Sequence, residues 1–140
     1  MRDEERSNRR RKILFVCEHN TGRSQIASVI ARHHAEDRAL IRSVGPDPQP
    51  IGNAEIVNQL NERGYDTSLV YPKELTSRTI YESDYVVLIG GDELDGFRDN
   101  AAEEWHIDDP ETMDADGVSK VIDDIDARVR NLLEQEGVLD

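Results

Sequence analysis

The chain has 140 residues, which is enough to bury one hydrophobic core as a single domain. Its 30 acidic side chains outnumber the 17 basic ones, and the formal net charge of −13 at pH 7 argues against nucleic acids and anionic membranes as partners. No stretch approaches the ~20 apolar residues of a membrane span, and the chain does not open with a signal-peptide pattern.

The first 11 residues are charged or polar after Met1, with five arginines set against three carboxylates. A segment without apolar residues cannot contribute to a core, so we expect a disordered N-terminal arm over residues 1–11. The folded domain is predicted to cover residues 12–140.

An apolar run over residues 12–16 predicts a strand, and it ends at Cys17, the only cysteine. The next residues complete the pattern Cys-x5-Arg-Ser, and a helical pattern follows at once. A thiolate is a strong nucleophile, and loop amides beside a helix N-terminus favour both the thiolate and a bound anion. The pattern predicts an enzyme that acts on a tetrahedral oxyanion through Cys17; the alternative is a buried structural thiol.

Each residue type in this loop has a chemical use. The planar guanidinium of Arg23 can hold two oxygens of a phosphate or arsenate, and the Ser24 hydroxyl can donate to the sulfur. Gly22 permits close approach of backbone to ligand, and Asn20 tolerates a left-handed conformation. His19 either tunes the thiolate or is simply solvated. The predicted substrate-binding residues are Glu18, His19, Asn20, Thr21, Gly22, Arg23 and Ser24.

Beyond the loop, apolar periodicity predicts alternating helices and strands. Helices are expected over residues 24–37, 53–63, 76–82 and from about 118 to 133, and strands over residues 40–44 and 85–89. Ser24 is expected at the N-terminus of the first helix, and Gly64 just beyond the second. This alternation predicts an α/β fold with a parallel sheet and helices on both faces, in which ligands bind at the carboxyl ends of the strands.

The string over residues 16–27 resembles the low-molecular-weight protein tyrosine phosphatase superfamily, and specifically its arsenate reductase branch, where Cys-x-His-Asn-x-Gly-Arg-Ser-Gln is typical. Residues 43–45, 64–68, 84–87 and 104–110 extend the similarity, which covers about residues 12–136. The resemblance implies a four-stranded parallel sheet with a phosphate-binding loop between the first strand and the first helix.

The same resemblance implies a general acid on a late loop, at the aspartate before a proline. That position is Asp109, which makes Cys17, Arg23 and Asp109 the predicted catalytic residues. The alternative is that Asp108 or Asp109 only shapes a turn before Pro110. Neither a metal nor a bound cofactor is implied.

Two departures from the family bear on the reaction. Thioredoxin-linked arsenate reductases carry two further cysteines after the third strand, whereas the segment here begins Ile89-Gly90-Gly91, so one cysteine excludes an internal disulfide relay. Phosphotyrosine phosphatases usually carry aromatic residues after Asp-Pro, where this chain has Glu111-Thr112-Met113.

These observations predict a cysteine-dependent phosphomonoesterase that forms a cysteinyl-phosphate. The alternative is a single-cysteine arsenate reductase that uses an external glutathione-like or mycothiol-like thiol, with a glutaredoxin-like partner. A non-catalytic oxyanion-binding protein is the third hypothesis. The substrate would be a phosphate monoester or arsenate.

Arginine outnumbers lysine 14 to 3 in this acidic chain. We expect such a composition in a high-salt cytoplasm, where salt screens the repulsion between an anionic substrate and the protein to within a few ångströms. A lone thiol also fits a reducing compartment, and the predicted location is therefore cytoplasmic.

Overall fold

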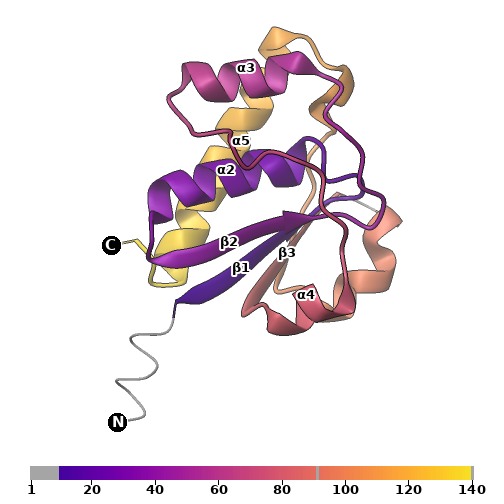
Figure 1. The fold of residues 1–140 in the computed structure, drawn as a ribbon, viewed down its shortest axis with the longest axis vertical. Helices are drawn as coiled ribbons and strands as arrows, with labels where there is room; N and C mark the ends of the chain where they lie inside the picture. Colours follow the sequence, from indigo (N-terminus) through magenta and orange to yellow (C-terminus); the bar gives the residue numbers. More distant parts are fainter. Residues whose placement is uncertain (1–9, 91, 140) are drawn as a thin grey trace.

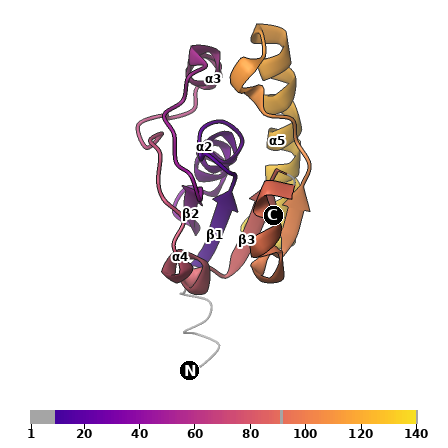
Figure 2. The same cartoon turned by 90° about the vertical axis from the view of Figure 1, so that its right-hand side faces the viewer.

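A four-stranded parallel sheet with the strand order β2-β1-β3-β4 forms the centre of the fold (Figure 1). The computed structural model describes residues 10–90 and 92–139. The strands are β1 (Arg11–Val16), β2 (Ala39–Val44), β3 (Tyr85–Ile89) and β4 (Glu103–Trp105). β1 pairs with β2 on one side and β3 on the other, and Figure 2 shows these three strands running in the same direction. The predicted fold class is confirmed.

In the part of the chain that the structure describes, four α-helices and two 3-10 helices connect and cover the strands. They are α2 (Arg23–Ala35), α3 (Ala54–Glu62), α4 (Ser77–Glu82), η1 (Asp92–Asn100), η2 (Pro110–Thr112) and α5 (Ala115–Gln135). Side chains of Asn53, Thr76 and Asp114 cap the first turns of α3, α4 and α5 by accepting backbone N–H groups. Within the described residues, none of the helices combines the length and the apolar character needed to cross a membrane.

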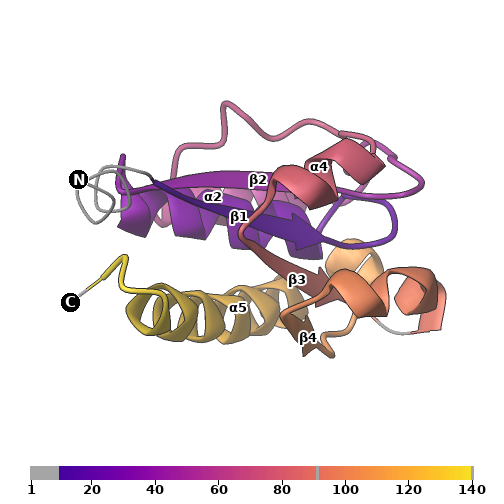
Figure 3. The same ribbon diagram turned by 90° about the horizontal axis from the view of Figure 1, so that it is seen from below.

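The strands separate two cores of unequal size. The larger core packs one face of the sheet against α2, α3 and α5, and includes Phe15, Ile30 and Ile122. The smaller core lies on the other face, where Leu14 and Leu88 meet Ile80 of α4. Figures 1 and 3 show α2 and α5 together on one side of the sheet and α4 on the other. Burial on both faces explains the continuous apolar runs of β1 and β3.

The sheet begins one residue earlier than predicted. Arg11 pairs with Ala39 in the β1–β2 ladder, and its side chain forms an ion pair with Glu136. Arg11 is therefore part of the domain and not of the predicted arm. Residues 1–9 of that arm lie outside the described residues.

Strand β4 has no apolar pattern that would predict it. It is held by side chains: the Tyr85 hydroxyl and the indole N–H of Trp105 both donate to the Glu103 carboxylate. Trp105 itself is buried and packs against Phe15, with ring centroids 5.8 Å apart. Trp105 thus acts in packing, and it fixes the strand that leads into residues 106–113.

Candidate active site

The side chains of Asn20, Ser24 and Cys17 form a hydrogen-bonded series at the loop of residues 17–22, which we call the Cys17 loop. Ser24 Oγ lies 2.9 Å from Cys17 Sγ, and Asn20 Nδ2 donates to the same hydroxyl at 2.7 Å. The backbone N–H of Lys73 donates to Asn20 Oδ1, which fixes the amide so that its NH2 group faces Ser24. Because Ser24 Oγ accepts from Asn20, its own hydrogen is left to donate to the sulfur. This arrangement directs a hydroxyl donor at the sulfur.

The backbone of the Cys17 loop turns sharply at Asn20, whose φ of 50° lies in the left-handed region. Asparagine accepts this conformation more readily than most residues, as expected from the sequence. Gly45, the first residue after β2, lies directly behind the turn: a Cβ there would be 2.5 Å from the Cys17 carbonyl oxygen and 2.7 Å from the Asn20 nitrogen. The loop therefore has a rigid support.

Gln25 is a second support that the sequence analysis did not single out. Its Nε2 lies within hydrogen-bond distance of the Asn20 carbonyl, of Asn20 Oδ1 and of the Tyr71 carbonyl, and its Oε1 accepts from Ser43. The side chain is only 1 % exposed. Its position directly after Ser24 in the family-like string was the one available signal.

Helix α2 begins one residue earlier than predicted, at Arg23. Gly22 is its N-cap residue, no side chain caps it, and Ser24 lies within the first turn with its hydroxyl turned to Cys17. Ser24 lies at the N-terminus of the helix, as expected, and its hydroxyl contacts the sulfur and does not cap the helix. A helix N-terminus without a side-chain cap directs amide groups and the positive end of the helix dipole toward the loop, which suits a bound oxyanion.

Arg23 is the first residue of α2 and is buried. Its Nη1 donates to the carbonyl of Ile107 at 3.0 Å. Ile107 belongs to the segment of residues 106–113, which we call the late loop. The cation is thereby positioned by two segments that are 84 residues apart in the chain.

The other predicted substrate-binding residues of the Cys17 loop differ in their burial. Thr21 is buried, whereas Glu18 and His19 are partly exposed. The ring Nδ1 of His19 lies 3.1 Å from the Asp47 carbonyl oxygen, and the backbone N–H of Asp47 donates to the Glu18 carbonyl. His19 is thus fastened to residues 45–53, which we call the β2 loop.

The late loop lies against the Cys17 loop through a contact between Pro110 and Gly22. Asp109 immediately precedes this contact; it is exposed, and its Oδ1 accepts the backbone N–H of Glu111 at 3.0 Å. The turn-forming role considered for Asp109 is therefore present. It uses one carboxylate oxygen and is compatible with proton transfer by the other.

The late loop is also tied to the β2 loop. Glu111 accepts the backbone N–H of Gly52, and Asn53 Nδ2 donates to the carbonyls of Pro110 and Met113 at 2.8 and 3.0 Å. The position that carries an aromatic residue in many phosphatases of the resembled family is here used as a clamp between two loops. Sequence reasoning missed this contact, since its partners are 59 residues apart.

Comparison with known proteins places these features in a family context. Residues 12–137 match the sequence model of a family described as low molecular weight phosphotyrosine protein phosphatase. A candidate arsenate reductase of Halobacterium salinarum is 31% identical over 130 residues, which cover 89% of this chain and 92% of that protein.

Two solved structures are similar in fold. The thioredoxin-dependent arsenate reductase of Corynebacterium glutamicum is 30% identical with a TM-score of 0.76; the match covers 95% of this chain but only 65% of that one. A tyrosine phosphatase of Erwinia amylovora is 19% identical with a TM-score of 0.77, and the match covers 91% of this chain and 93% of that one. At 19% identity, the similarity to the Erwinia amylovora structure concerns the fold alone.

Proposed function

The chain belongs to the low molecular weight phosphotyrosine protein phosphatase family, and from this premise we propose that it is a single-cysteine arsenate reductase. The observation that carries the proposal is the hydrogen-bonded series Asn20–Ser24–Cys17 at the N-terminus of α2. It supplies a stabilised thiolate beside amide groups and the buried Arg23, which is the equipment for attack on a tetrahedral oxyanion.

In the proposed reaction, the Cys17 thiolate attacks the arsenic of arsenate. A sulfur–arsenic bond forms as an arsenic–oxygen bond breaks, and the departing oxygen takes a proton from Asp109 and leaves as water. An external thiol then attacks the arsenic of the adduct: a new sulfur–arsenic bond forms, the bond from arsenic to Cys17 breaks, and Cys17 is released as the thiolate. A second external thiol attacks the sulfur of this new adduct, the two external thiols become a disulfide, and the arsenic takes up the electron pair of the broken sulfur–arsenic bond and leaves as arsenite. Arg23 and the loop amides hold the equatorial oxygens throughout.

Two observations support arsenate over a large phosphate ester. Two relatives, at 31% and 30% identity, are described as arsenate reductases, whereas the similar phosphatase structure lies at 19%. In addition, the residue after Asp109-Pro110 is Glu111, which holds Gly52 and offers no ring on which a phosphotyrosine could stack. Both favour a small inorganic oxyanion. This reverses the order expected from the sequence, which put the phosphomonoesterase first.

The electrons must come from outside the chain, since Cys17 is its one cysteine. We propose a low-molecular-weight thiol of the glutathione-like or mycothiol-like kind, with a glutaredoxin-like protein supplying the second thiol. Such thiols are kept reduced in the cytoplasm, where we place the reaction.

A phosphomonoesterase is the second candidate. Its chemistry needs a nucleophile, a cation and an acid, which Cys17, Arg23 and Asp109 would supply. These residues lie on two segments that are joined by two contacts, one between Gly22 and Pro110 and one between Arg23 and Ile107. Asp109 would protonate the leaving oxygen and then activate water to hydrolyse the cysteinyl-phosphate.

The two candidates separate in one set of assays on the wild-type protein and the Cys17→Ser variant, in molar potassium chloride. Cys17-dependent arsenite production that requires an added thiol supports the reductase. Cys17-dependent hydrolysis of para-nitrophenyl phosphate, with no arsenite formed, replaces it by the phosphatase. If the folded protein binds phosphate but shows neither turnover, both are wrong and a non-catalytic oxyanion-binding protein is left.

A further inference from the structure

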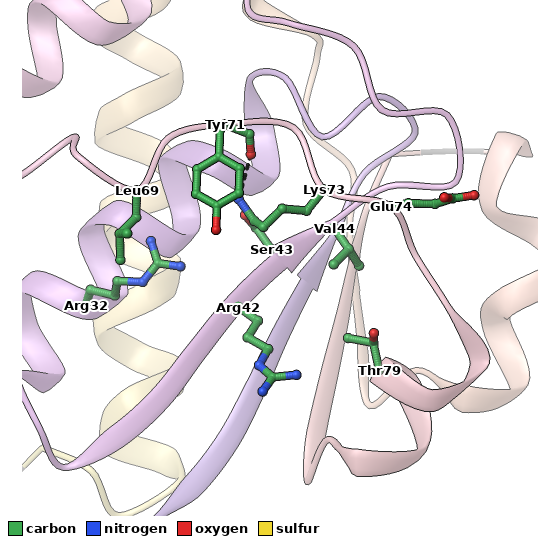
Figure 4. A pocket seen from close by; sticks show the side chains of 9 residues that line it. All are labelled: Arg32, Arg42, Ser43, Val44, Leu69, Tyr71, Lys73, Glu74 and Thr79. Atoms are coloured by element: carbon green, nitrogen blue, oxygen red, sulfur yellow. Dashed lines mark hydrogen bonds between the residues drawn. The ribbon is translucent and has the colours of Figure 1, made fainter.

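A cavity, which we call the β2-edge cavity, lies at the β2 edge of the sheet, behind the Cys17 loop. It has a volume of about 330 Å³ and is bounded by the end of β2, by residues 69–74 and by α4. Glu74 bridges to Gly45, so this segment runs beside β2 and roofs the cavity. The lining residues are Arg32, Arg42, Ser43, Val44, Leu69, Tyr71, Lys73, Glu74 and Thr79 (Figure 4).

The charge of this cavity is opposite to that of the protein. Three basic side chains, Arg32, Arg42 and Lys73, line it against one carboxylate, that of Glu74, although the whole chain carries −13. Figure 4 shows Glu74 pointing away from the other polar side chains. Positive charge has thus been concentrated in one hollow of an acidic molecule.

The neighbouring carboxylates compensate these cations only in part. Glu82 lies 3.9 Å from Arg42 but forms its short contact, at 2.7 Å, with Arg78. Arg32 donates to the Ile41 carbonyl and has Asp66 in its vicinity.

Lys73 is the least compensated of the three cations. Its Nζ donates to the Tyr71 carbonyl, and the ammonium lies 4.2 Å from the centre of the Tyr71 ring. Burial, together with the positive charge of Arg32, lowers the pKa of Lys73 to about 8. An anion between the two cations would relieve this repulsion.

The cavity also offers apolar surface and hydroxyl groups. Leu69 and Tyr71 are large side chains that remain 49% and 53% exposed, although both line the hollow. Ser43 and Thr79 add hydroxyls from β2 and α4. A volume of this size admits a small organic molecule as well as an inorganic ion.

We propose that this cavity is a second anion site, separate from the Cys17 loop, and that it takes a small anion with two or more phosphate or carboxylate charges. Arg32, Arg42 and Lys73 supply the charge that recognises the ligand, and Tyr71 and Leu69 cover its less polar part. Guanidinium groups pair with both phosphate and carboxylate oxygens, so the two chemistries share the site.

Residues 71–73, which border the β2-edge cavity, also form hydrogen bonds with Asn20 and Gln25, the side chains that support the Cys17 loop. The backbone N–H of Lys73 donates to Asn20 Oδ1, and the Tyr71 carbonyl accepts from Gln25. The first contact holds the Asn20 amide, which donates to the Ser24 hydroxyl beside Cys17, and the second holds Gln25, whose Nε2 lies 3.1 Å from Asn20 Oδ1. A ligand that orders residues 71–73 therefore acts on the alignment of the thiolate, and the site has a route by which to regulate turnover.

The test is a titration of the full-length Cys17→Ser protein with pyrophosphate and, separately, citrate, followed by amide chemical shifts at low ionic strength. Saturable shifts at residues 69–79 are expected. The affinity reported by these shifts should fall about tenfold or more in Arg42→Gln and in Lys73→Gln. Arg130→Gln is the matched control, because Arg130 is also basic and paired with a carboxylate but lies 56% exposed on α5, outside the cavity, and it should leave the affinity unchanged.

Several outcomes would overturn the proposal. One is the lack of saturable shifts with both probes, and another is an equal loss of affinity in Arg130→Gln. A third is that the shifts at residues 69–79 follow those of residues 18–24 with the same dissociation constant in every variant. The last result would mean that one ion in the Cys17 loop causes all the changes. A response to pyrophosphate alone or to citrate alone assigns the site to phosphates or to carboxylates.

Discussion

A Cβ atom at position 22 would lie 2.9 Å from Cγ of Pro110, so the late loop rests directly on the backbone of the Cys17 loop. Real Cβ atoms essentially never approach a neighbour this closely, and a side chain at this position must push the two loops apart. The distance between the proposed nucleophile and the proposed acid therefore depends on one glycine.

Gly22→Ala is expected to lower kcat by about 100-fold while the protein stays folded, because displacing catalytic groups by about 1 Å costs rate of that order. The measurement is steady-state turnover together with thermal unfolding. Gly96→Ala serves as control, since no atom lies within 4 Å of a Cβ at that position. Unchanged turnover in Gly22→Ala would show that the contact does not position the acid.

Ser24→Ala removes the hydroxyl that lies 2.9 Å from Cys17 Sγ. Hydrogen bonds to charged groups contribute about 1.5–3 kcal/mol, so the rate of alkylation of Cys17 by iodoacetamide at neutral pH should fall about tenfold or more. Ser28→Ala is the matched control: Ser28 is a buried serine of the same helix, and it donates to the Gln25 carbonyl. Equal alkylation rates in both variants would contradict the assignment of Ser24 to the thiolate.

Asp109 can be tested for both of its candidate roles at once. The variant Asp109→Asn keeps an oxygen that can accept the Glu111 N–H but loses the acidic proton, whereas Asp109→Ala loses both. If Asp109 is the acid, Asp109→Asn slows substrates with poor leaving groups far more than those with good ones, while the melting temperature stays close to that of wild type. If it only shapes the turn, Asp109→Asn retains full activity and Asp109→Ala alone is impaired.

Citrate binding at the β2-edge cavity should weaken as pH rises from 7 to 9. The pKa of Lys73 is lowered to about 8, so its ammonium is charged below this pH and neutral above it, and the cavity, which Arg32, Arg42 and Glu74 also line, loses one positive charge. We expect a loss of about tenfold in affinity, measured by titration calorimetry. Lys73→Arg should remove most of this dependence. An equally steep decline in that variant would mean that Lys73 is not the group whose titration weakens binding.

The sequence predicted the features that rest on local patterns. The apolar runs located β1 and β3 because both are buried on two faces, and Asn53 and Thr76 marked helix starts because their side chains accept orphan N–H groups. The φ of 87° at Gly64 likewise agrees with its expected place after α3. The Cys-x5-Arg-Ser pattern identified the loop because its chemistry lies within eight consecutive residues.

Features that depend on distant partners could not be predicted in this way. Strand β4 is stabilised by Tyr85, which donates to a glutamate 18 residues further along the chain and looks ordinary in sequence. The clamp between Glu111 and Gly52 joins positions that only the fold brings together. The basic cavity likewise takes its cations from α2, β2 and the segment before α4.

Cys17 is 1% exposed. A lone thiol on an open surface would let two copies of the protein cross-link by oxidation, and the resulting covalent dimer would be inactive. At the base of a tight loop, the sulfur of one copy cannot reach that of another, because each is recessed behind its own backbone. A small thiol can reach the Cys17 sulfur, whereas the surface of a second protein cannot. The burial of Cys17 thus restricts its reductants to narrow molecules.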